Sequence, residues 1–277
     1  LDIDIENFTG NAEQIEVLWK KNNSLSQKIK LGTFVPYLFG TGIGIFWQFD
    51  HEFYNGLYTK SERKFMFHAY LPILNSLQVG YNKGKILATN LGKNSGYKDV
   101  DFLAISLRSE LDTRNDRLLP VSGKFFNMMI DGGVDGKYIF IKTDIKYQVF
   151  LHVLNNTYAK FQTVINGISY PTGLIPKSRY FNLGGASSLR GFDEKAFIFT
   201  QYQILTFELI NQQKSPLQIK SFIDLGSNKF NISENTLFGY GIGLNQVNEK
   251  SIVSVEYSLG SNHQRGGKIH VKWSTRF

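Results

Sequence analysis

Residues that commonly carry chemistry are few in this chain, and they do not form a reactive pattern. There is no cysteine, and the five histidines stand apart at positions 51, 68, 152, 263 and 270. None of them has the close spacing of a metal-ligand pair. No Gly-x-Ser-x-Gly elbow occurs, and Gly40-Thr-Gly-Ile-Gly44 lacks the Gly-Lys-Ser/Thr that completes a phosphate loop. The sequence therefore predicts no enzyme activity, no metal and no cofactor.

Composition excludes several further classes of protein. Hydrophobic residues make up 42% of the chain and charged residues 19%, a balance that a disordered protein does not have. No apolar run approaches the ~18 residues of a transmembrane helix. The net charge of +8 is carried by basic residues that recur mostly singly, such as Lys142 and Lys146, and not in a cluster. This spread does not favour nucleic acid as a partner.

The hydrophobic periodicity is that of β-strands almost throughout. Residues 137–151 alternate between an apolar and a mostly polar face, with Ile139, Ile141, Ile145, Tyr147, Val149 and Leu151 against Phe140, Lys142, Asp144, Lys146 and Gln148. We expect about fifteen such strands, near 1–9, 12–22, 25–36, 43–53, 57–70, 74–87, 98–112, 123–133, 137–151, 157–168, 195–210, 216–226, 236–246, 251–260 and 267–277. No linker divides the series, so residues 1–277 are expected to form one domain.

The connections between these strands tend to alternate in length, most clearly in the second half. Shorter ones lie at 34–44, 115–123, 154–157, 211–216 and 246–250, and longer ones at 85–98, 169–195, 227–236 and 260–267. Short turns on one side and long loops on the other are typical of an outer-membrane barrel. A soluble barrel or sandwich also alternates, but it buries its apolar face. Strand number, loop lengths and aromatic residues near strand ends favour a barrel surrounded by lipid; the aromatics are Tyr37, Tyr54, Tyr58, Tyr70, Trp273 and Phe277.

The longest loop contains the run Tyr180-Phe-Asn-Leu-Gly-Gly-Ala-Ser-Ser-Leu-Arg-Gly-Phe192. An arginine at a loop tip, flanked by Gly191 and the bulky Phe192, can fold back into the polar lumen of a barrel. A guanidinium buried there must be paired, because an uncompensated buried charge is costly. The alternative is an arginine exposed to solvent in a mobile loop.

This run resembles the loop signature of the BamA/TamA/FhaC superfamily of outer-membrane assembly and secretion barrels. Leu183-Gly184-Gly185 and Leu189-Arg190-Gly191-Phe192 stand at the expected spacing, and five predicted strands follow the loop, as in that family. Weaker resemblances at 6–11, 112–123, 222–226 and 273–277 extend the similarity over essentially the whole chain. The resemblance implies an all-β, transmembrane antiparallel barrel of about sixteen strands, fifteen or sixteen of them in this chain, with long extracellular loops and short periplasmic turns.

The same resemblance implies partners for the arginine on the barrel wall. Glu208 and Asp224 would face the lumen near Arg190, and a forked guanidinium can bridge two carboxylates. Phe222, two residues before Asp224 on the same face, would add a cation–π contact. We therefore expect the loop at 170–194 to be folded into the lumen.

The alignment with the family also concerns the two ends of the chain. Residues 1–9 correspond to its second strand, so its first strand and its periplasmic POTRA repeats are expected to be absent from this sequence. The C-terminal strand resembles the signal that ends in an aromatic residue and would form one side of a lateral seam. The residues of that signal are Ile269, Val271, Trp273 and Phe277.

The function implied is insertion of β-barrel proteins into an outer membrane, or translocation of polypeptide across it. Alternatives are a two-partner-secretion pore, the membrane anchor of an upstream enzymatic domain of the patatin type, and a passive porin. The location implied is the outer membrane of a Gram-negative bacterium, in preference to that of an organelle. The partners implied are outer-membrane lipids and nascent β-barrel or secreted polypeptides, with accessory lipoproteins or periplasmic proteins.

Overall fold

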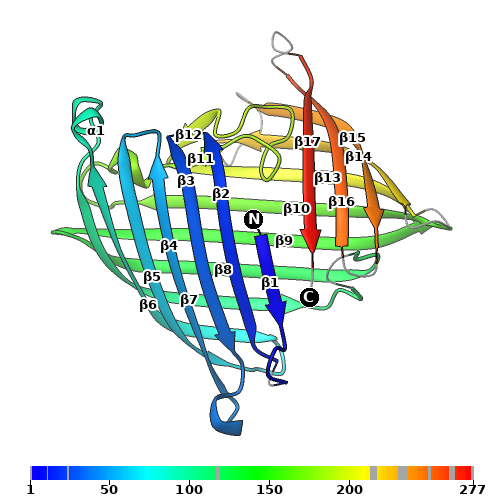
Figure 1. The fold of residues 1–277 in the computed structure, drawn as a ribbon, viewed down its shortest axis with the longest axis horizontal. Coiled ribbons are helices and arrows are strands. Elements are labelled where there is room, and N and C mark those ends of the chain that lie inside the picture. Colours follow the sequence, from blue (N-terminus) through cyan, green and yellow to red (C-terminus); the bar gives the residue numbers. More distant parts are fainter. Residues whose placement is uncertain are drawn as a thin grey trace.

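The computed structural model describes residues 2–10, 12–23, 25–116, 119–212, 217–229, 236–248, 251–261 and 266–275. Fifteen strands form one continuous sheet. It curls round so that its first strand, β1 (Asp2–Glu6), and its last, β17 (Lys268–Thr275), come to lie next to each other (Figure 1). The all-β antiparallel barrel predicted from the sequence is confirmed.

Each strand pairs with the next along the chain, except where one loop intervenes between β10 and β13. After β1 come β2 (Gln14–Asn23), β3 (Ser26–Val35), β4 (Ile43–Tyr54), β5 (Tyr58–Ala69), β6 (Ser76–Ala88), β7 (Val100–Asp112), β8 (Gly123–Asp135), β9 (Tyr138–Leu154), β10 (Thr157–Ser169), β13 (Gln201–Gln212), β14 (Leu217–Ser227), β15 (Leu237–Val247), β16 (Ser251–Gly260) and β17. Short helices are η1 (Leu38–Gly40), α1 (Asn90–Asn94) and η2 (Lys177–Arg179). Within the described ranges, no helix is long and apolar enough to cross a bilayer.

The fifteen predicted segments correspond one to one with the strands of the sheet, and only one boundary differs substantially. The segment expected at 195–210 joins the barrel only from Gln201. The residues before it form β12 (Phe197–Phe199), which pairs with β11 (Phe181–Leu183) in a separate two-stranded sheet. Phe197 and Phe199 pack on an apolar cluster inside the loop, so their alternation belongs to the loop and not to the wall.

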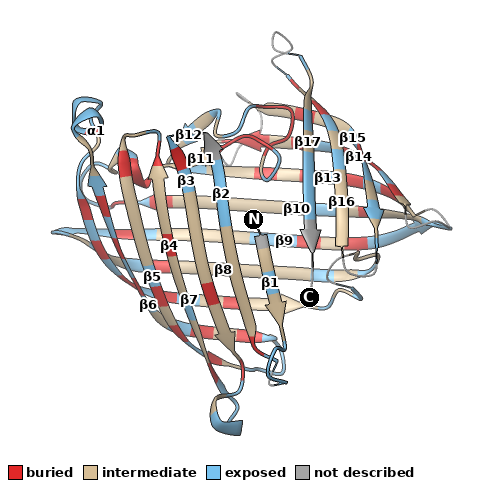
Figure 2. Cartoon of the chain, viewed as in Figure 1, coloured by how far each residue is buried: buried red, intermediate tan, exposed pale blue. Residues whose placement is uncertain are grey.

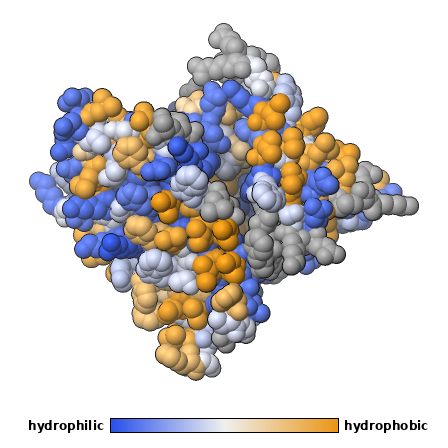
Figure 3. All heavy atoms as spheres, viewed as in Figure 1, coloured by the Kyte–Doolittle hydropathy of each residue, from blue (hydrophilic) through white to orange (hydrophobic). Residues whose placement is uncertain are grey.

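The two faces of the strands are distributed as a lipid-facing barrel requires. On β14 the polar side chains of Gln218 and Asp224 are 3% and 0% exposed, whereas Ile219 and Ile223 are 45% and 41% exposed. Figure 2 shows buried positions recurring along the strands, and Figure 3 shows apolar side chains over the front strands on both the β2 side and the β16 side. A soluble barrel would bury its apolar side chains and expose its polar ones. The alternation seen here is therefore that of a barrel surrounded by lipid.

The aromatic residues near strand ends do not all face outward. Tyr37, Tyr70 and Trp273 are exposed, as an interfacial girdle requires. Tyr54 and Tyr58 are buried and stacked on each other at 5.0 Å, so their expected place in the girdle is wrong. They belong to an apolar cluster inside the barrel, because their positions in β4 and β5 have the parity of the lumen-facing residues.

The lengths of the connections follow the predicted asymmetry clearly in the second half of the chain and only in part in the first. In the second half, the loops at 170–200, 228–236 and 261–267 alternate with short turns at 155–156 and 248–250. In the first half, the connection at 89–99, which contains α1, is long as predicted, but those at 24–25 and 55–57 are short although they lie at the same end. The rule of long loops and short turns therefore applies best to the part of the barrel that carries the motif.

Among the described residues, the sheet ends at β1 on one side and at β17 on the other, and these two strands lie next to each other. In the order of the sheet, β1 and β17 are the terminal strands, and no ladder joins them among the described residues. Thirteen strands lie between them in the sheet and every neighbouring pair is antiparallel, so β1 and β17 run in the same direction, as their arrows show (Figure 1). We call this junction between β1 and β17 the seam.

Candidate functional site: the loop inside the barrel

The loop at 170–200 leaves the wall at the end of β10 and returns at the start of β13. Its base is closed by the β11–β12 pair, in which Phe181 lies opposite Phe199 and Leu183 opposite Phe197. This pairing brings the residues between the two strands, 184–196, together as a compact tip. The contacts of that tip are with side chains on the lumen side of the wall, so the loop lies inside the barrel (Figure 1).

Glycines allow the tip to turn sharply and to approach the wall. Gly184, Gly185 and Gly191 have φ values of 116°, 101° and 90°, which side chains rarely adopt. A Cβ on Gly191 would lie 2.5 Å from the carbonyl carbon of Leu259 on β16. The three glycines of the motif are thus required by the backbone itself, since any side chain at these positions would be strained.

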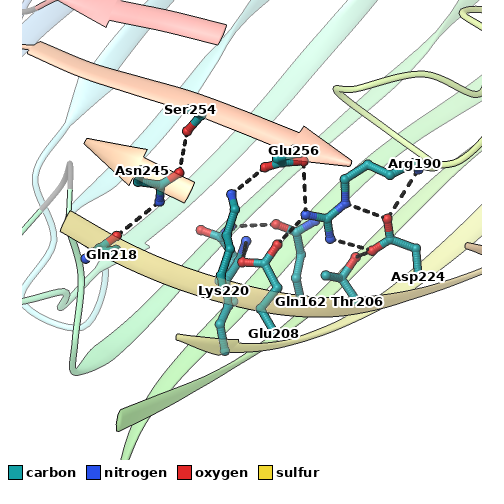
Figure 4. A network of polar contacts seen from close by, with 12 residues as sticks. Gln162, Arg190, Thr206, Glu208, Gln218, Lys220, Asp224, Asn245, Ser254 and Glu256 are labelled. Atoms are coloured by element: carbon teal, nitrogen blue, oxygen red, sulfur yellow. Dashed lines mark hydrogen bonds and ion pairs between the residues drawn. The ribbon is translucent and has the colours of Figure 1, made fainter. Parts of the chain in front are cut away.

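Arg190 is the centre of the site and is 6% exposed. Its Nε and Nη2 donate to the two carboxylate oxygens of Asp224, each at 2.7 Å, and its Nη1 donates to Oε1 of Glu208 at 2.7 Å. The backbone N–H of Arg190 adds a third bond to Asp224, at 3.2 Å. Figure 4 shows the side chain reaching from the loop to both carboxylates. Such forked, charge-assisted bonds fix both position and orientation.

The surroundings complete the arginine's contacts. The guanidinium carbon lies 3.4 Å from the centre of the Phe222 ring, and Glu256 on β16 approaches Nη1 at 3.5 Å. Thr206 donates to Asp224 at 2.8 Å, so every oxygen of that fully buried carboxylate accepts a bond. Burial alone would lower the pKa of Arg190, but the bonds to Asp224 and the charges of Glu208 and Glu256 raise it, so the side chain stays charged.

Apolar residues of the motif anchor the tip next to the arginine. Leu189 is fully buried and packs with Leu183 and Ile204, and Phe192 is also buried there. Phe192 meets Phe197 edge to face at 5.2 Å. In the motif, Arg190 thus binds the wall electrostatically, and Leu189 and Phe192 on either side of it remove apolar surface from water.

Sequence reasoning missed a row of glycines on β15 that makes room for the loop. A Cβ on Gly239 would collide with the carbonyl oxygen of Arg190, and one on Gly241 would lie 2.7 Å from the Phe222 ring. The signal was present in the sequence as Gly239-Tyr-Gly-Ile-Gly243, in which glycine occupies every position of the lumen face.

Three consecutive charged residues beyond the motif also contact the wall, and their roles were not predicted. Asp193 pairs with Lys268 on β17 at 2.7 Å. Glu194 pairs with Lys20 on β2 at 3.5 Å, and Lys195 with Glu52 on β4 at 2.9 Å. The tip therefore forms ion pairs with strands on both sides of the seam.

A second buried arginine holds the first part of the loop. Arg179, in η2, has its guanidinium carbon 3.8 Å from the ring centre of Phe102 and 4.4 Å from that of Phe140. A lone arginine before the motif gave no sequence signal, because its ring partners lie on β7 and β9, far away in the chain.

The residues of the C-terminal signal lie apart from the loop site. Ile269, Val271 and Trp273 are all exposed on the outward face of β17, where the alternation places them, and Phe277 lies outside the described residues. Within the part of the chain that the structure describes, no three His, Asp or Glu side chains gather as a metal site would need.

Comparison with known proteins identifies the family. The sequence matches the model of the Omp85 superfamily domain over residues 7–259. A search of curated proteins finds no match. Among solved structures, BamA from Haemophilus ducreyi lacking POTRA domains 1-3 has a TM-score of 0.73 at 13% identity, with 98% of this chain and 66% of that chain covered.

Two solved structures of CdiB are similar as well. The protein from Acinetobacter baumannii has a TM-score of 0.66 at 12% identity, and the alignment covers 98% of this chain and 55% of that one. For the protein from Escherichia coli the values are 0.63, 13%, 98% and 57%. The chain thus spans 66% or less of the length of each of these proteins.

Proposed function

This chain belongs to the Omp85 superfamily, whose barrels lie in outer membranes, and we propose that it assembles β-barrel proteins there by pairing their strands at the seam. The observation that carries the proposal is that β17, the last strand in the order of the sheet, has no ladder with β1 beside it among the described residues. In hydrocarbon an unpaired backbone N–H or C=O costs several kcal/mol. Pairing of an extended chain with the strand edges at the seam is therefore strongly favourable.

The direction of the two edge strands supports this use. Because β1 and β17 are parallel to each other, a single strand between them would be antiparallel to both. The family resemblance puts the strand before β1 at this place, and a substrate strand would compete with it for the edge of β17. Antiparallel pairing is the arrangement that every other strand of this sheet adopts. A nascent β-strand is thus a partner whose hydrogen-bonding pattern fits both sides of the seam.

The loop supplies a way to hold the barrel together while the seam lacks a ladder. Arg190 fixes the tip to β13 and β14 through Glu208 and Asp224, and the ion pairs of Asp193 and Lys195 reach β17 and β4. In this proposal the loop is a latch that bridges the two sides from within. The outer membrane is that of a Gram-negative bacterium, and accessory lipoproteins or periplasmic proteins deliver the substrates.

The test uses the absence of native cysteine, which makes an introduced pair unambiguous. One cysteine replaces Ile3 near the start of β1 and one replaces Trp273 near the end of β17, because these ends of the two strands lie side by side (Figure 1). The full-length protein is then reconstituted in proteoliposomes with an unfolded outer-membrane barrel as substrate. We expect the protein to accelerate substrate folding, a disulfide across the seam to abolish the acceleration, and reduction to restore it. Each single-cysteine variant is the matched control.

Two results would contradict assembly at the seam. If the protein with a crosslinked seam still accelerated substrate folding, pairing of substrate strands with β1 and β17 would not be part of the mechanism. No acceleration by the wild type would favour a secretion pore, a membrane anchor for an enzymatic domain or a passive porin. A secretion pore is the second candidate, and the polar interior of the barrel supports it, because an extended polypeptide could pass there once the loop had moved.

A further inference from the structure

Beyond the loop site, the lumen contains a cluster of basic residues that the latch does not use. Below the loop tip, at the end opposite to that where the loop enters, lies a cavity of about 500 Å³. Arg114, Lys160 and Lys272 line it, and Ser187 and Ser188 of the tip form part of its wall. Lys146 lies over the same Phe125 ring as Arg114, and together with Arg114, Lys160 and Lys272 it forms what we call the basic vestibule.

The charges of the vestibule are only partly balanced. Arg114 is paired with Asp112 through bonds of 2.8 and 2.7 Å, and Lys160 with Glu208 at 3.1 Å. Lys146 and Lys272 form no ion pair with any described carboxylate. Lys146 contacts instead the ring of Phe125, at 5.7 Å from its centre.

In the upper part of the lumen most of the basic residues are paired. There, Lys142 pairs with Asp144 at 2.8 Å, Lys60 with Glu62 at 3.1 Å and Lys195 with Glu52. Lys64 and Arg179 have no ion pair among the described residues, but they are buried against Met129 and against two phenylalanine rings.

Glu208 and Glu256 also line the cavity of the vestibule, but Lys160, Arg190 and Lys220 already pair with them. Lys146 and Lys272 therefore have no ion-pair partner among the described residues, and like charges close to one another favour a ligand that brings negative charge.

The position of Lys272 indicates what kind of ligand this is. It lies on the edge strand β17 and faces the lumen, whereas its neighbours Val271 and Trp273 face outward. Side chains alternate along a strand, so an extended chain paired with β17 would direct every second residue toward the vestibule. We propose that the basic vestibule binds acidic residues at these positions of an extended polypeptide substrate, an inference that rests on the proposed use of the seam.

The experiment measures binding directly and does not depend on assembly activity. Fluorescently labelled short peptides that alternate Ser with Glu, Ser with Gln, or Ser with Lys are titrated against the full-length protein in detergent, and anisotropy is recorded. We expect the Glu peptide to bind about tenfold more tightly than the Gln peptide, as two partly exposed charge pairs imply. Its affinity should fall with added salt, because the charges are accessible to solvent.

Variants assign the binding to the vestibule. The double variant Lys146→Gln and Lys272→Gln should lose the preference for the Glu peptide. It removes like-charge repulsion, so we expect it to fold, which the heat-dependent gel shift of the barrel checks. The matched control is Lys98→Gln, an exposed lysine in the connection before β7, which should bind the Glu peptide as the wild type does.

The outcomes separate this inference from the proposed function. Equal affinity for the Glu and Gln peptides, or an unchanged preference for the Glu peptide in the double variant, would contradict binding of acidic residues in the vestibule. This holds even if the protein accelerates barrel folding. A preference that the double variant loses would support that binding. If the wild type did not accelerate barrel folding but still preferred the Glu peptide, the proposed assembly function would be wrong. An acidic polypeptide would remain the ligand of the vestibule.

Discussion

Two arginines of the same loop, Arg190 and Arg179, are buried to nearly the same extent but are held in different ways. Arg190 is 6% exposed and donates to two carboxylates that lie on adjacent wall strands. Arg179 is 7% exposed and lies between two phenylalanine rings, while its Nε and Nη2 have no hydrogen-bond partner among the described residues.

The difference teaches what each contact can specify. Forked bonds to Asp224 and Glu208 require one position and one orientation of the guanidinium, so they determine where the loop tip lies. The faces of Phe102 and Phe140 attract a cation but accept a range of positions. We infer that Arg190 fixes the tip, and that Arg179 mainly fills space between the rings at the beginning of the loop.

The largest expected effect is that of Arg190→Met, which tests the contact with the carboxylates. Asp224 and Glu208 would remain buried with less compensation, and breaking a buried pair in this way costs about 3–5 kcal/mol. Urea unfolding, followed by the gel shift of the folded barrel, should show this loss. Trypsin should also cleave at Lys195, which the tip no longer holds. The control is Lys98→Met, and unchanged stability in Arg190→Met would contradict the latch.

A smaller effect is expected when the support beneath Arg190 is altered instead of its charge. Gly241→Val would place side-chain atoms against the carbonyl oxygen of Tyr257 on β16 and against the Phe222 ring, and it would displace the ring from the guanidinium. Overpacking of this kind costs about 1–3 kcal/mol. Gly42→Val, in the connection before β4 and with no atom near its Cβ, is the matched control. Equal stabilities of the two variants would show that the ring does not support the arginine.

The comparison also shows how far the sequence could predict the site. The strands were predictable because alternation has a period of two, which each strand displays by itself. Arg190 was predictable because its motif is local, and its partners followed from the family resemblance. Arg179 was not, because its rings lie on β7 and β9 and nothing in the chain links them to a loop. Tyr54 and Tyr58 were misplaced because aromatic residues at a strand end suit either face.

Exposed ion pairs at the tip offer a third kind of contact between the loop and the wall. The triple variant Asp193→Asn, Glu194→Gln and Lys195→Gln removes the pairs with Lys268, Lys20 and Glu52. Because solvent reaches these pairs, we expect a loss of about 1 kcal/mol in total. The wild type should lose a similar amount at high salt, whereas the triple variant should be insensitive to salt. If the stability of the triple variant still depended on salt, other charges of the protein would be the cause of that dependence.

The smallest expected effect is that of Arg179→Met, the same substitution that is expected to be most harmful at Arg190. It removes the cation–π contacts with Phe102 and Phe140, but it also removes a buried charge with unsatisfied donors and replaces it with an apolar side chain. These changes oppose each other, so stability should stay within about 1 kcal/mol of the wild type. The urea midpoint of both methionine variants, measured side by side, decides the comparison. If Arg179→Met lost as much stability as Arg190→Met, the rings would specify the loop's position as strictly as the carboxylates do.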